Sequence, residues 1–154
     1  MDADRSVLFI EVALGTIAAW MSRHDVHQET MRRARCSLPP GHLSLLNRLS
    51  ARGPLRIGAL ALMLGIDNST ITPQIQSLER DGLIVRNPDP RDGRAALVEI
   101  TQAGERLLTR LRRTRQTMLN EKLSSWPRQE REAAAAAISR LADALVQPSP
   151  TPRY

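Results

Sequence analysis

Cysteine is nearly absent from this sequence, and long hydrophobic runs are missing. A single cysteine in 154 residues excludes an intramolecular disulfide framework and a cysteine-rich zinc cage, which fits a reducing compartment. No apolar run approaches the ~20 residues that a membrane-spanning helix needs. Asp2 and Asp4 precede the first apolar stretch, whereas a secretory signal begins with basic residues. These absences predict a cytoplasmic protein without a membrane partner.

The sequence also lacks a recognisable catalytic constellation. It contains three histidines, and its carboxylates are scattered without a nucleophile, a phosphate-cradling loop or paired acids. His24 and His27 have the spacing of two ligands on one helix face, but no carboxylate or cysteine cluster completes a tetrahedral metal site within this motif. A hydrolase would need both histidines and Glu29 to hold a metal and activate water. We therefore expect neither an enzyme nor a bound metal or cofactor.

Positive charge is in moderate excess. Lysine and arginine number 22 and aspartate and glutamate 16, which gives a formal net charge of +6 at pH 7. Such a charge draws a protein toward polyanions, although many basic proteins bind none. The charge therefore supports a nucleic-acid partner without establishing one.

Residues 55–101 carry the most informative pattern of the chain. Apolar residues with helical spacing predict a helix over residues 56–64, and Gly65 stands where helices often end in left-handed backbone. Asp67 is a good N-cap for a second helix, which is expected to end at Gly82. Two short helices joined by a tight turn are typical of a helix-turn-helix, which places its second helix in the DNA major groove.

The second helix is expected to have two different faces. Its apolar residues Ile71, Ile75 and Leu78 form one narrow stripe that suits a core. The opposite face carries short, neutral side chains near its N-terminus, and their hydroxyl and amide groups suit bonds to base edges or phosphates. The residues on this face and at its flanks are Ser69, Thr70, Thr72, Pro73, Gln76, Ser77 and Arg80.

A basic β-hairpin is expected to follow. Residues 83–86 and 95–100 are rich in β-forming residues, and Asp92-Gly93 between them is a strong turn signal. The tip presents Arg91 and Arg94, and the acids Asp89 and Asp92 are close enough in sequence to bond to them and orient them. An oriented arginine suits the narrow, electronegative minor groove. The order helix, turn, helix and hairpin is that of a winged helix.

The helices that flank this segment carry apolar stripes of their own. In residues 4–22 the stripe follows steps of three and four, like the seam of a coiled coil, and the last helix carries a similar stripe. Such stripes must be buried against the rest of the chain or against a second copy. The residues expected at a dimer seam are Val7, Ile10, Leu14 and Ile17 in the first helix, and Ile138, Leu141 and Leu145 in the last.

The end of the first helix has two possible roles. Trp20 suits the dimer core. Together with Met21 and His24 it would also line a ligand cavity between the dimer helices and the DNA-binding lobe. A small-molecule effector is therefore a possible partner.

Cys36 is the only thiol. Positive charges nearby would lower its pKa and favour redox sensing. They belong to Arg32, Arg33 and Arg35. The alternative is a thiol without a sensing role.

Three motifs follow one another in register along residues 38–112. They read Leu78-Glu79-Arg80-Asp81-Gly82-Leu83-Ile84-Val85-Arg86, Asp89-Pro90-Arg91-Asp92-Gly93-Arg94 and Ile100-Thr101-Gln102-Ala103-Gly104. Together they resemble the multiple-antibiotic-resistance regulator (MarR) family of transcriptional regulators.

The resemblance implies an obligate homodimer that reads a palindromic operator. It implies that Asn68–Gln76, with Asn68 and Gln74 among them, face the major groove, and that Arg94, supported by Asp92, lies in the wing. Three residues depart from the pattern. Arg56 and Gly58 stand where the family often has a capping residue and a better helix former, and Pro73 replaces an arginine that is common there, although Thr-Pro occurs in some branches. The organic-peroxide sensors of this family carry their reactive cysteine in the first helix, so Cys36 does not correspond to it.

We therefore expect a mainly α fold with a small β-hairpin wing. A winged helix-turn-helix over residues 37–101 would be flanked by dimerisation helices over 1–36 and 102–147, with a disordered tail over 148–154. The function expected is a dimeric, sequence-specific regulator that binds double-stranded DNA, a repressor relieved by a small ligand. The alternatives are a winged-helix module that binds protein and a thiol-based redox regulator acting through Cys36.

Overall fold

The computed structural model describes the backbone of residues 2–146 and the side chains of residues 5–92 and 95–146. The expected tail at 148–154 and the side chain of Arg94 therefore lie outside the described residues. The described residues form two compact units, which divide between Arg115 and Gln116.

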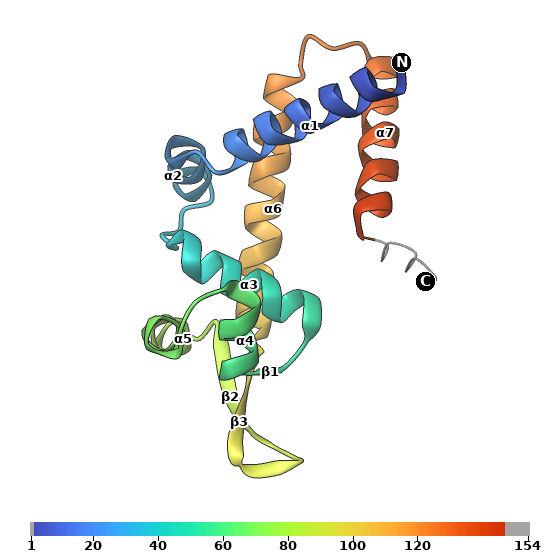
Figure 1. Cartoon of the computed structure of the whole chain (residues 1–154). Helices are drawn as coiled ribbons and strands as arrows, with labels where there is room; N and C mark the ends of the chain where they lie inside the picture. Colours follow the sequence, from blue (N-terminus) through green and yellow to red (C-terminus); the bar gives the residue numbers. More distant parts are fainter. Residues whose placement is uncertain (1, 147–154) are drawn as a thin grey trace, which may run out of the picture. The chain divides into compact units, whose positions relative to one another are not determined.

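The first unit contains most of the elements (Figure 1). They are α1 (Asp2–Met21), α2 (His24–Arg33), α3 (Pro40–Arg52), β1 (Leu55–Arg56), α4 (Ile57–Leu64), α5 (Asn68–Arg80), β2 (Ile84–Asp89), β3 (Asp92–Ile100) and the beginning of α6 (Gln102–Lys122). The second unit holds the end of α6 and α7 (Arg128–Val146). The expected fold class, mainly α with a small β-hairpin, is confirmed.

α4 and α5 form the predicted helix-turn-helix. Gly65 ends α4 with a φ of 66°, and Gly82 follows α5 with a φ of 68°. Both lie in the left-handed region, which glycine adopts without steric cost. The helix ends predicted at these two glycines are therefore confirmed.

The core of the first unit joins α3, α4 and α5 to the sheet and to the start of α6. Burying one such aliphatic side chain stabilises the fold by roughly 1.5–3 kcal/mol. Because the stripe on α5 is part of this core, the opposite face of α5 is turned outward. The largest fully buried side chains are Leu45, Leu46, Leu49, Leu60, Ile71, Ile75, Leu78, Val98 and Leu111.

The sheet corrects two expectations. Its strand order is β1-β3-β2, and Leu55 and Arg56 pair with β3 in extended backbone, so the helix predicted from residue 56 begins at Ile57. β2 and β3 are also longer than predicted, because the turn falls at Pro90-Arg91 and Asp92-Gly93 belongs to β3. Proline presets the φ of the first central residue of a turn, which suits Pro90-Arg91, and the register with β3 selects this turn over the one at Asp92-Gly93.

α1 carries apolar side chains on its surface. Val7 is 65% exposed and Ile10 42%, and Leu14 and Ile17 of the same stripe are 38% and 46% exposed. Among the described residues, no single helix is long and apolar enough to cross a membrane. One bent pair of helices has the length and composition of a membrane span when the two are taken together. It consists of Arg5–Met21 and His24–Arg33, with a bend of 52° between them.

Candidate nucleic-acid interface

Asp67 caps the N-terminus of α5. Its Oδ1 accepts a hydrogen bond from the Ser69 hydroxyl at 2.6 Å and another from the backbone N–H of Thr70 at 2.7 Å. These two bonds, with the Ser69 hydroxyl first, hold the pKa of Asp67 below its ordinary value, since they favour the ionised carboxylate. The cap predicted from the sequence is confirmed, and it fixes the first turn of the helix that presents the candidate interface.

The outward face of α5 presents most of the predicted side chains to solvent. The Thr72 hydroxyl is bonded to the carbonyl of Asn68 at 2.6 Å, so it is occupied by its own helix. The remaining polar groups on this face, together with the positive end of the helix dipole, suit an anionic neighbour. Asn68, Ser69, Thr70, Pro73, Gln76 and Arg80 are exposed, and Thr72 and Gln74 are half-buried.

Gln74 differs from the other predicted contact residues. Its Oε1 is buried and has no hydrogen-bond partner within the described structure. A Cβ added at Gly41 would lie 2.9 Å from this oxygen, which places the amide against the N-terminal turn of α3. A buried amide oxygen without a hydrogen-bond partner is costly. Its contact with DNA stays a prediction.

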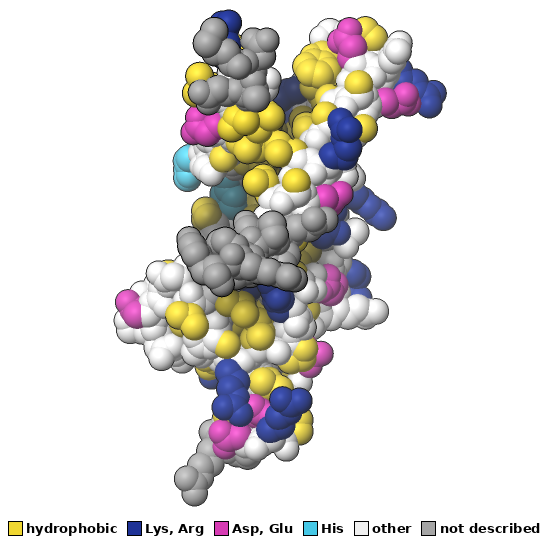
Figure 2. Space-filling view, turned by 45° about the vertical axis from the view of Figure 1, so that its right-hand side comes forward, with side chains coloured by type: hydrophobic (Ala, Val, Ile, Leu, Met, Phe, Trp, Pro, Cys, Tyr) yellow, Lys and Arg dark blue, Asp and Glu magenta, His cyan; other side chains and the backbone are white. Residues whose placement is uncertain are grey.

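The wing is anchored by a residue whose role sequence reasoning missed. Asp89 was expected to orient the side chains of the tip, but its carboxylate instead binds the Arg56 guanidinium, with Nη2 at 2.6 Å, and accepts the backbone N–H of Arg91 at 2.8 Å. The hydrogen bond from the Arg91 N–H, followed by the bond from Arg56, lowers the pKa of Asp89 below its ordinary value. Figure 2 shows basic and acidic side chains gathered on the wing. Arg91 itself is exposed and Asp92 half-buried.

Arg56 and Asp89 come together only when their strands pair with β3 in the sheet. Arg56 and Asp89 lie 33 residues apart, and Arg56 reads in the sequence as a poor helix cap. The sequence shows only that Arg56 and Asp89 carry opposite charges and lie next to two predicted elements. That information does not specify a contact between them.

A hollow of about 490 Å³ lies within the first unit, between the segment that joins α2 to α3, the segment that joins α5 to β2, and the first turns of α6. Trp20, Met21 and His24 do not line it, so their role in a ligand cavity stays a prediction. Its wall combines apolar side chains with two cations and with the carboxylate of Asp81, which suits a small amphipathic molecule. The lining includes Cys36, Leu38, Leu83, Arg106, Leu107 and Arg110.

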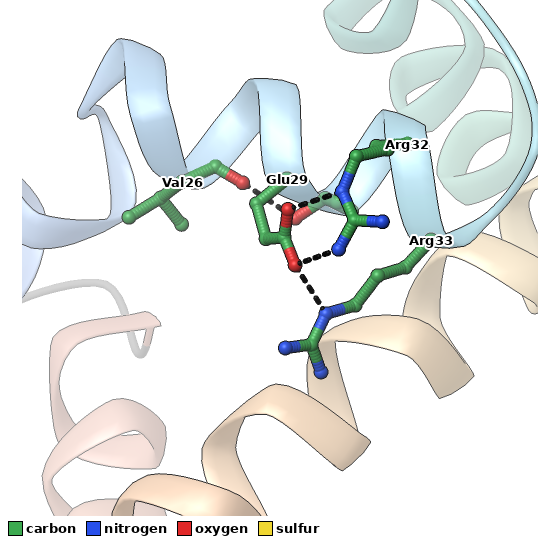
Figure 3. Close-up of polar contacts among 5 residues, drawn as sticks. Val26, Glu29, Arg32 and Arg33 are labelled. Atoms are coloured by element: carbon green, nitrogen blue, oxygen red, sulfur yellow. Dashed lines mark hydrogen bonds and ion pairs between the residues drawn. The ribbon is translucent and has the colours of Figure 1, made fainter.

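Two of the three arginines near Cys36 bind Glu29. Glu29 accepts from Arg32 Nη2 at 2.6 Å and from Arg33 Nε at 2.6 Å, as Figure 3 shows. The Cys36 thiol instead lies 3.7 Å from the sulfur of Met31. Two of the three positive charges expected to act on the thiol are therefore partly compensated by Glu29.

The two histidines of α2 make ordinary hydrogen bonds. His27 Nε2 lies 2.9 Å from the carbonyl oxygen of Leu38, and His24 Nε2 lies 2.7 Å from the Gln28 amide nitrogen. Over the part of the chain that the structure describes, no group of three or more histidine, cysteine or acidic side chains could hold a metal ion.

Glu29 is expected to titrate far below an ordinary glutamate. The bonds from Arg32, followed by those from Arg33, lower its pKa from 4.5 to about 2. Because the folded-state pKa is depressed, the stabilisation is fully present above pH 4.5 and is lost as pH falls through about 2. NMR titration of the Glu29 carboxyl carbon measures this, and Arg32→Gln should move the midpoint upward. A wild-type midpoint near 4.5 would contradict the ion pairs.

Known proteins share both the sequence and the fold. The MarR family model matches residues 38–96. The helix-turn-helix transcriptional regulator YxaD of Bacillus subtilis is 31% identical over 146 residues, which cover 95% of this chain and 99% of that protein.

Two solved regulators share the fold. The transcriptional regulator Tm0710 from Thermotoga maritima is 26% identical, with a TM-score of 0.73 over 88% of this chain and 93% of that one. The PcaV transcriptional regulator from Streptomyces coelicolor, solved in complex with its natural ligand, is 27% identical, with a TM-score of 0.53 over 85% of this chain and 92% of that one. This chain therefore belongs to the MarR family, whose members are DNA-binding transcriptional regulators and not enzymes.

Proposed function

We propose that this regulator is a homodimeric repressor that binds a palindromic operator in the cytoplasm. Each copy inserts α5 into the major groove and its wing into the adjacent minor groove, with half-sites about one helical turn apart. The observation that carries the proposal is the capped, outward polar face of α5. The residues assigned to DNA are Asn68, Ser69, Thr70, Thr72, Pro73, Gln74, Gln76 and Arg80 in α5, and Arg91, Asp92 and Arg94 in the wing.

The dimer is formed by the apolar faces of the flanking helices. In one copy these side chains meet water, and large exposed apolar surfaces mark sites of association. Their exposure in α1 and α7 supports a second copy as the partner that covers them. The residues assigned to this interface are Val7, Ile10, Leu14, Ile17, Ile138, Leu141 and Leu145, of which Ile138 and Leu145 are 56% and 65% exposed.

Relief by a small ligand completes the proposal. PcaV was solved in complex with its natural ligand, and this chain has a hollow of about 490 Å³ beside the first turns of α6. A ligand bound there, or near Trp20, Met21 and His24, would change the spacing of the two reading helices and break their register with DNA. A compound that saturates the protein and leaves its operator affinity unchanged would contradict relief by that compound.

Selection from random duplexes tests the operator. The purified protein should enrich a palindrome, and titration should give two protomers per duplex. If no sequence is enriched, the proposal fails and a protein-binding winged helix takes its place.

Arg94→Ala is expected to weaken operator binding by about 1–3 kcal/mol. The reason is the loss of a wing contact in the minor groove, so the dimer and the melting temperature should be unchanged. Fluorescence anisotropy measures the affinity and light scattering the dimer. Superimposable titration curves would remove Arg94 from the interface.

A further inference from the structure

Arg56 occupies the junction between the sheet and the helix-turn-helix. It is the last residue of β1 and immediately precedes α4. Its guanidinium binds the Asp89 Oδ2 twice, through Nε at 2.7 Å and Nη2 at 2.6 Å. Asp89 is the buried partner, with a side chain 6% exposed against 47% for Arg56. The pair therefore ties the last residue of β2 to the start of α4, the first helix of the helix-turn-helix.

The same carboxylate also holds the turn. Its other oxygen, Oδ1, accepts the backbone N–H of Arg91 at 2.8 Å, inside the Pro90-Arg91 turn. Asp92, the register partner of Asp89 across the hairpin, places its Oδ2 3.6 Å from Arg56 Nη2. The Arg56 guanidinium thus faces a carboxylate from each strand of the hairpin.

Main-chain pairing is short or irregular around this contact. β1 pairs with β3 through only two residues, Leu55 opposite Val98 and Arg56 opposite Leu97. The register of β2 and β3 shifts between Pro88 and Asp89, so the ladder is irregular where the Arg56 side chain arrives. A hairpin end held by an irregular ladder depends on side-chain contacts for its direction.

We propose that Arg56 is a positioning residue that sets the direction of the wing relative to the recognition helix α5. The inference rests on the proposed function, because it requires α5 and the wing to meet DNA together. α4 continues from Arg56 and packs on α5, so the ion pair connects the wing to the reading helix through one rigid element. Loss of the Arg56–Asp89 ion pair leaves the DNA-contacting residues unchanged, but it allows the hairpin tip to change its position relative to α5.

A double-mutant cycle tests the assignment on the full chain. Arg56→Gln and Asp89→Asn should each weaken binding to the selected palindrome about tenfold, the effect of losing one charge-assisted bond. The double variant should also bind about tenfold more weakly, because both changes remove the same contact. Arg56→Lys should restore part of the affinity. Arg52→Ala, which removes an exposed charge at the end of α3, is the matched control.

A second readout separates positioning from folding. The wild type should prefer operators flanked by A·T-rich sequence, whose minor groove is narrow, and Arg56→Gln should lose that preference at a temperature where circular dichroism shows the variant to be fully folded. Two results would overturn the inference while the proposed function stands. One is an unchanged operator affinity of Arg56→Gln, and the other is a double variant whose loss of affinity equals the product of the losses in the two single variants. A wild type that binds no duplex would overturn both.

Discussion

Leu14→Glu is expected to convert the dimer to monomers and to abolish operator binding at concentrations where the wild type is saturated. Leu14 lies in the middle of the α1 stripe and is 38% exposed in a single copy. A carboxylate buried there against a second copy would have no partner, at a cost of several kcal/mol. A monomer presents one reading helix, so it also loses the second half-site.

Light scattering and anisotropy measure the two effects together. Glu11→Lys is the matched control, because it changes the charge of the same helix at a position that is already charged. The control should remain dimeric. An intact dimer of Leu14→Glu would contradict the assignment of this stripe to the interface.

Gly104→Ala is expected to destabilise the fold by about 1–3 kcal/mol or more, the range for overpacking a well-filled core. A Cβ on Gly104 would lie 2.5 Å from the backbone oxygen of Leu83 and 2.6 Å from Ile100 Cγ1. The backbone oxygen cannot move aside as a flexible side chain would, so the start of α6 must shift away from the sheet.

Gly58→Ala supplies the matched control. An added Cβ at Gly58 meets nothing within 4 Å, and this glycine lies inside α4. Alanine is the better helix former, so this variant should be as stable as the wild type or more stable by about 0.5–1 kcal/mol. Urea unfolding measures both variants, and a Gly104→Ala midpoint equal to that of the wild type would contradict the close approach.

Local chemistry made much of the fold predictable. Gly65 and Gly82 mark helix ends because glycine accepts left-handed backbone, and Asp67 marks a helix start because its carboxylate satisfies a free N–H. The periodic stripe of α5 then determined which of its faces turns outward. Each of these signals acts within a few residues of the chain.

Features that depend on distant residues were not predictable in this way. The turn at Pro90-Arg91 competes with a second plausible turn two residues later, and the outcome depends on the register with β3. The partner of Asp89 is Arg56, on a strand too short to show a pattern of its own. Gln74 lies on the helix face expected to meet DNA, but the approach of α3 at Gly41 turns its amide inward.

The same limit applies to the thiol. The sequence places Arg32, Arg33 and Arg35 beside Cys36. Glu29, one helical turn earlier, binds Arg32 and Arg33. A cluster of like charges in a sequence therefore indicates an electrostatic effect only after its counter-charges have been placed.

An anisotropy titration of the selected palindrome over a series of salt concentrations tests the central claim most directly. Phosphate contacts release counterions, so the logarithm of the affinity should fall linearly with the logarithm of the salt concentration, and two protomers should bind each duplex. Binding that is independent of salt, or that does not distinguish the palindrome from an unrelated duplex, would contradict a sequence-specific DNA-binding dimer.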